Sequence, residues 1–133
     1  MLEAVAVFVA VLVGTFTMHF FADFPLQAFE PYHSKMEKKY EKLSHLGWHV
    51  LVYGLCITAF GMVISSLTHG SPALGVIFGL FNALSHGVVD FFTSRITKPQ
   101  WDQKDVPSFF TTIGFDQMVH GIVLILTAGW MLV

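Results

Sequence analysis

The chain has 133 residues, of which 54% are hydrophobic and only 12% are charged, whereas a soluble domain carries about 25% charged residues. A net charge of −2 gives no basic surface for nucleic acid, so no nucleic-acid partner is expected. A single cysteine excludes an intrachain disulfide and a multi-cysteine metal site. The sequence therefore predicts one all-α integral membrane domain over residues 1–133.

Four segments are long and apolar enough to span a bilayer as helices, which takes about 20 residues. In chain order, they run over about residues 2–24, 43–67, 72–94 and 108–133. Pro25 disfavours helix beyond the first span, and Ser71 followed by Pro72 is a start signal for the third. The apolar runs are continuous rather than alternating, which predicts a bundle of four transmembrane helices.

The connection between the first two spans has a helical pattern of its own. Aromatic and methionine side chains recur there every three or four residues, at Phe29, Tyr32, Met36 and Tyr40, with lysines between them. This pattern is typical of an amphipathic helix in the membrane interface. Membrane lipid is therefore the expected partner of this segment and of the apolar spans.

Basic residues predict the orientation of the chain. Lys35, Lys38, Lys39 and Lys42 follow the first span, and Arg95, Lys98 and Lys104 follow the third. The short turn between the second and third spans contains neither lysine nor arginine. The positive-inside rule then places both basic connections in the cytoplasm and both chain termini outside.

Each predicted span carries one pair of metal-ligand-type residues four positions apart. The pairs are His19 and Asp23, His45 and His49, His86 and Asp90, and Asp116 and His120. Residues at this spacing share one face of a helix, and ionisable residues inside a membrane are costly and usually functional. Because the helix directions alternate, all four pairs fall within about 15 Å of the cytoplasmic boundary.

The composition of this polar layer points to a divalent metal. Five imidazoles and three carboxylates suit zinc, with iron or manganese as alternatives. Eight donors fit two ions about 3.5–4 Å apart, while a single ion with some aspartates orienting the histidines is also consistent. A network of His–Asp hydrogen bonds that only holds the bundle together is the alternative without metal.

The sequence also suggests roles for individual polar residues in and near these pairs. Asp23 and Asp116 are the predicted catalytic residues, since an aspartate that is not fully engaged as a ligand can act as a general base. Gln117 is expected to point to a different face from its neighbour Asp116. Asn82 and Thr15 are expected to make ordinary interhelical hydrogen bonds.

Two further patterns concern packing. Small residues form a row along the third span at Gly75, Gly79, Ala83 and Gly87. Such a row allows close approach of a neighbouring helix or association into a homo-oligomer. The first and third spans also share a pattern, Thr15-His19-Asp23-Phe24 and Asn82-His86-Asp90-Phe91. Each is followed by a span with a second ligand pair, which predicts two like-oriented hairpins around an approximate two-fold axis.

The combined motifs resemble a known family. The chain contains His19-x3-Asp23-Phe24-x-Leu26-Gln27-x7-Lys35, then His45-x3-His49, His86-x3-Asp90 and Asp116-Gln117-x2-His120. This string resembles small bacterial and phage inner-membrane proteins known only as a domain of unknown function. More distantly, the spans are similar to inner-membrane proteins described as metal-dependent hydrolases. The resemblance implies a multi-pass protein of the bacterial inner membrane.

Three functions are consistent with these patterns. The leading hypothesis is a metal-dependent hydrolase at the cytoplasmic leaflet that acts on a lipid-like ester, amide or phosphoester, with the metal activating water and polarising the substrate. The second is a metal-ion or proton transporter, although few polar residues continue the layer outward. The third is a membrane scaffold braced by a structural metal.

Overall fold

The computed structural model describes residues 2–26 and 43–133, which form four helices and contain no strand. The helices are α1 (Leu2–Asp23), α3 (Leu43–His69), α4 (Ala73–Asp102) and α5 (Val106–Met131). All four are long and apolar enough to cross a membrane, which confirms the predicted bundle. The predicted interfacial helix around residues 29–40 lies outside the described residues.

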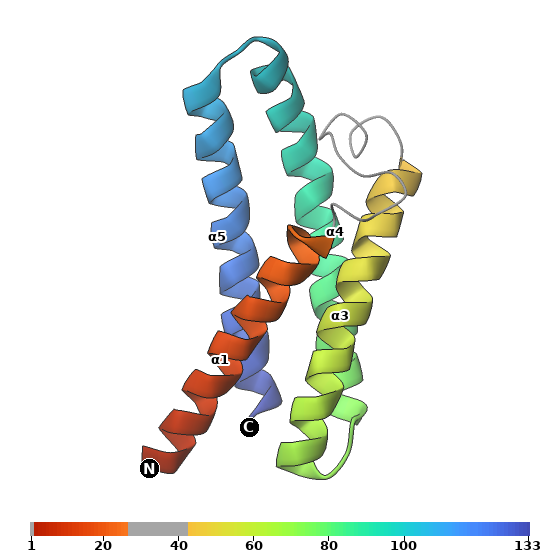
Figure 1. The fold of residues 1–133 in the computed structure, drawn as a ribbon, viewed down its shortest axis with the longest axis vertical. Helices are drawn as coiled ribbons and strands as arrows, with labels where there is room; N and C mark the ends of the chain where they lie inside the picture. The colour runs from red at the N-terminus through yellow and green to blue at the C-terminus, as the bar shows by residue number, and fades with distance from the viewer. Residues whose placement is uncertain (1, 27–42) are drawn as a thin grey trace.

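The helices form a ring in which each contacts two neighbours. α3 packs against α4, α4 packs against α5, and α1 contacts both α3 and α5. Both chain ends lie at the same end of the bundle as the α3–α4 turn, and the α4–α5 turn lies at the opposite end (Figure 1). This agrees with the alternating directions expected from the sequence, while the placement of the termini outside the cell stays a prediction.

α4 differs most from its predicted bounds. It continues about two turns beyond the predicted end near residue 94 and passes through Pro99. These turns are polar but still helical, and Lys98 donates to Asp102 across one turn at 2.6 Å. α5 begins slightly earlier than predicted, because Asp105 caps it by accepting from the Ser108 N–H. The α4–α5 hairpin therefore extends past the ends of α1 and α3 (Figure 1).

The polarity of the bundle is opposite to that of a soluble protein. Among the described residues, ten buried side chains are hydrophobic and thirteen are polar or charged. Large apolar side chains instead face outward, such as Phe20, Leu84 and Leu126, which are 53%, 70% and 68% exposed. An apolar exterior around a polar interior is the arrangement that lipid surroundings favour.

α3 and α4 approach each other through the predicted row of small residues. A Cβ atom at Gly75 would overlap the backbone of Gly61, and one at Gly79 would overlap Thr58. Farther along, Ala83 lies against Gly54. These contacts set the register of the two antiparallel helices. Since α3 of the same chain covers this row, a homo-oligomer stays a prediction and would need another surface.

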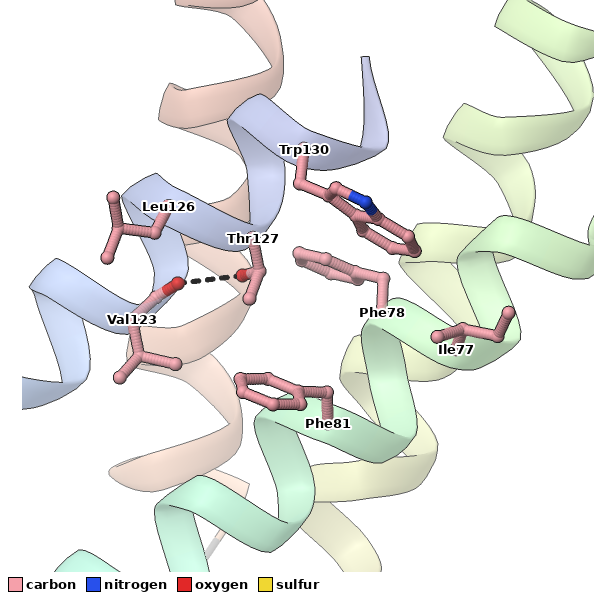
Figure 2. Close-up of a pocket in the computed structure, with 7 residues that line it drawn as sticks. All are labelled: Ile77, Phe78, Phe81, Val123, Leu126, Thr127 and Trp130. Carbon is pink, nitrogen blue, oxygen red and sulfur yellow. Dashed lines mark hydrogen bonds between the residues drawn. The ribbon is translucent and has the colours of Figure 1, made fainter. Parts of the chain in front are cut away.

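An apolar groove lies between the first half of α4 and the second half of α5. Its volume is about 430 Å³, and Figure 2 shows Phe78 and Phe81 of α4 facing Val123 and Trp130 of α5. Thr127 also lines it, but its hydroxyl is already used by the Val123 carbonyl at 2.8 Å. None of the His and Asp pairs lines this groove, so we assign it to the lipid-facing surface.

The close α3–α4 contact predicts a clear difference between two glycine substitutions. Gly75→Ala should destabilise the protein by about 1–3 kcal/mol, because the added methyl overlaps a helix backbone that cannot move aside. Gly114→Ala in α5 is the matched control, since nothing lies within 4 Å of its added Cβ. Unfolding in detergent micelles measures both, and equal stability of the two variants would contradict the packing described.

Candidate metal centre

Six of the eight predicted donors converge between the four helices. The C-terminal residue of α1, one histidine of α3 and one pair each from α4 and α5 contribute to this cluster. Its members are Asp23, His49, His86, Asp90, Asp116 and His120. All are between 0% and 6% exposed. The four-residue spacing within α4 and α5 points both members of each pair to the same side of the helix.

Four of these residues, Asp23, His49, His86 and Asp90, form a four-donor group. The two imidazoles face each other with 3.0 Å between their Nε2 atoms. Oδ1 of Asp23 is 3.1 Å from the His49 Nε2 and 3.5 Å from the His86 Nε2. Oδ2 of Asp90 is 3.6 Å from each. These separations bracket the edge of a tetrahedron, about 3.4 Å, around a zinc ion with ligands at about 2.1 Å.

Asp90, Asp116 and His120 form a three-donor group. The His120 Nε2 is 3.4 Å from Asp90 Oδ1 and 3.5 Å from Asp116 Oδ2. Although two carboxylate oxygens lie within 3.5 Å, this buried nitrogen makes no hydrogen bond to the described residues. A buried polar atom without a hydrogen bond requires an explanation, and a cation between these three donors supplies one.

Asp90 belongs to both groups through different oxygens. Its Oδ2 faces His49 and His86, whereas its Oδ1 faces His120. A carboxylate shared in this way places the two groups side by side. The described residues therefore provide two adjacent sets of donors that could each hold a metal ion.

Hydrogen bonds from neighbouring side chains hold the carboxylates in place. Thr93 donates to Asp116 Oδ1 at 2.7 Å. Gln117 donates through Nε2 to Asp23 Oδ2 at 3.2 Å and to Asp116 Oδ2 at 3.1 Å. Such contacts orient ligands and leave the other carboxylate lone pairs for a metal.

Two of the predicted donors lie outside both groups. His19 is buried beside the cluster, but its Nδ1 is 3.1 Å from the Tyr53 hydroxyl and its Nε2 is 3.3 Å from Gln117 Oε1. His45 lies one turn before His49 in α3 and is half-buried. The structure thus brings together one donor each from α1 and α3 and both donors from α4 and α5.

Three residues at the cluster were not identified from the sequence. Gln117 was expected to point elsewhere, which is wrong, because its long side chain reaches the carboxylates of α1 and α5. Tyr53 stacks on His86 with 3.8 Å between ring centroids and 6° between planes. Tyr53 lies one turn beyond His49, and Thr93 lies three residues beyond Asp90, so helical spacing was the available signal.

Asn82 and Thr15 were both expected to make interhelical hydrogen bonds, and this prediction is confirmed for Asn82 but wrong for Thr15. Asn82 makes an interhelical hydrogen bond with Thr127 at 3.0 Å. Thr15 donates to the carbonyl of Val11 in its own helix. His69, at the end of α3, contacts the Met131 carbonyl at 2.7 Å, away from the cluster.

Comparison with models of protein families identifies the family of this chain. A family model described as "Protein of unknown function (DUF3307)" matches residues 8–133, a region that includes every donor in the cluster. The chain belongs to the DUF3307 family. Searches of curated proteins and of solved structures find no match. Since membership of DUF3307 assigns no activity, the function has to be inferred from the cluster.

If the cluster holds metal, its removal should lower stability. With free zinc at about 100 times the dissociation constant, binding at one site adds about 2.7 kcal/mol to the free energy of unfolding. Unfolding in detergent with zinc or with a chelator measures this difference. Asp90→Asn should abolish it because Asp90 serves both groups. His69→Asn, outside the cluster, should retain it. Equal stability of the natural chain under both conditions would contradict a metal centre.

Proposed function

We propose that the protein is a membrane-embedded metal-dependent hydrolase with a dinuclear His/Asp centre at the cytoplasmic side of the bacterial inner membrane. The observation that carries this proposal is the shared carboxylate of Asp90, whose two oxygens face different donor groups. Two metal ions about 3.5–4 Å apart are the arrangement found in two-metal hydrolases. Zinc is the metal that we favour, with iron or manganese as alternatives.

The two groups support different roles. The four-donor group has enough ligands for a closed tetrahedral site, so we assign it a mainly structural and electrostatic role. The three-donor group leaves a coordination position for water or for a substrate oxygen, as catalytic zinc sites do. We therefore place the chemistry at Asp90, Asp116 and His120.

The chemistry follows from the residues around the three-donor group. Metal ions bound here would activate water and polarise the substrate oxygen. Asp116 is the stronger general-base candidate, because it belongs to the three-donor group, where we place the open coordination position, and Thr93 holds its Oδ1. Asp23, the second predicted base, directs Oδ1 into the four-donor group and is better suited to holding the metal.

The position of the cluster favours a lipid-like substrate. Asp23 ends α1, while α4 continues for about 18 Å beyond Asp90 at 1.5 Å per residue. With the basic connections in the cytoplasm, this depth corresponds to the inner leaflet near its headgroups. An ester, amide or phosphoester of a membrane lipid would place its reacting group at this level.

A structural metal is the second candidate function, and the burial of the donors favours it. No donor of either group is more than 6% exposed. A sealed site would brace the bundle, and the protein would then act as a membrane scaffold. Transport remains less favoured, because the proposed sites are adjacent and do not form a series along the bundle.

The proposal predicts the metal content of purified variants. The natural chain should contain about two ions, and His120→Ala should lose one, because His120 serves only the three-donor group. Asp90→Ala should lose most of both ions. His69→Ala is the control and should keep the natural content. Elemental analysis makes the measurement, and equal losses in the His120 and Asp90 variants would contradict two separate positions.

The hydrolase proposal itself needs an activity measurement. Protein in liposomes should release product from at least one lipid in a panel of ester, amide and phosphoester lipids. Asp116→Asn should lower the rate by about 100- to 10,000-fold, as expected for loss of a general base. Metal-loaded natural protein that hydrolyses none of the panel would contradict the proposal and favour the structural metal.

A further inference from the structure

Gln117 on α5 contacts one carboxylate from each donor group. Its Nε2 is 3.2 Å from Asp23 Oδ2 and 3.1 Å from Asp116 Oδ2. Ionised carboxylates only accept hydrogen bonds, so the amide nitrogen must face them and the amide oxygen must face away. This orientation lets one side chain connect the two groups independently of the shared Asp90.

The amide oxygen of Gln117 continues a directed chain of hydrogen bonds. It is 3.3 Å from His19 Nε2, which must therefore carry the proton. The His19 Nδ1 then accepts from the Tyr53 hydroxyl at 3.1 Å. Every donor points toward the carboxylates, so each bond polarises the next. Because both its nitrogens are engaged in this way, His19 offers no lone pair to a metal.

The internal repeat shows why His19 differs from its counterpart His86. Aligning the two hairpins at their ligand pairs places Leu124 opposite Tyr53 and Leu46 opposite Gln117. The two polar residues that hold His19 therefore correspond to apolar residues, Leu124 and Leu46, at the positions that would hold His86. Among the described residues, the His86 Nδ1 makes no hydrogen bond, and the His86 Nε2 is directed into the four-donor group. Tyr53 supports this arrangement from the other side by stacking on the His86 ring.

We propose that Gln117 is a positioning residue that orients Asp23 and Asp116 for the two metal positions, and that His19 and Tyr53 orient Gln117 in turn. His19 then acts as a hydrogen-bonding support and not as a ligand. This inference rests on the metal centre of the proposed function, but it does not depend on hydrolysis.

Cobalt titration of the full chain in detergent tests this role. Cobalt is a spectroscopic substitute for zinc, and its visible absorption reports the ligand geometry directly. Gln117→Leu should weaken binding by about 10- to 100-fold, the usual effect of losing a residue that orients ligands, and should change the cobalt spectrum. Tyr53→Phe keeps the ring on His86 and removes only the hydroxyl, so it should weaken binding less but in the same direction.

Asn82→Leu is the matched control. Asn82 is a buried amide that joins α4 to α5 through Thr127, and it belongs to neither donor group. It should retain the natural affinity and spectrum. A folded Gln117→Leu protein with natural affinity and spectrum, or an equal loss in Asn82→Leu, would overturn the role of Gln117 alone. If Gln117→Leu does not fold, unchanged binding by Tyr53→Phe overturns it. Absence of cobalt binding by the natural chain overturns the metal centre as well.

Discussion

The mutual repulsion of buried carboxylates is the constraint on which the structure depends. Asp23 and Asp90 place oxygens within 4.8 Å of each other, and Asp116 adds a third carboxylate beside Asp90. Two such charges repel by about 3–4 kcal/mol at an effective dielectric constant of about 20. Protonated histidines would offset this charge, but the His49 and His86 nitrogens lie only 3.0 Å apart and would repel each other. Divalent cations bound between these donors would neutralise the carboxylates and use the imidazole lone pairs together.

The packing of the four helices holds these charged groups close together despite their mutual repulsion. The small residues between α3 and α4 let the two backbones approach closely, and this register brings His49 to the level of His86 and Asp90. α5 antiparallel to α4 brings Asp116 and His120 to the same level. α1 ends at Asp23, which adds a donor from the fourth helix. Apolar side chains on the outer faces allow this polar interior to exist within lipid.

Much of this arrangement was predictable because it depends on periodicity. Long apolar runs predict the helices, and a four-residue spacing predicts that His86 and Asp90 share a face. The end of α4 was not predictable from hydropathy, since Lys98 and Asp102 extend the helix beyond its apolar part. Helical spacing also could not assign His19, because its rotamer depends on Tyr53 and Gln117 from two other helices. The Gln117 side chain faces inward because α1 packs beside α5, and no pattern within the α5 sequence encodes that packing.

The most direct test of a two-metal centre is X-ray absorption spectroscopy at the zinc edge of the zinc-loaded protein. A centre built from these donors should show nitrogen and oxygen ligands at about 2.0–2.2 Å with the outer scattering of imidazole. The spectrum should also contain a metal–metal vector of about 3.5–4 Å, as expected for two ions in adjacent donor groups that share Asp90. A spectrum of oxygen ligands alone, without imidazole scattering or a metal–metal vector, would contradict the two-metal centre.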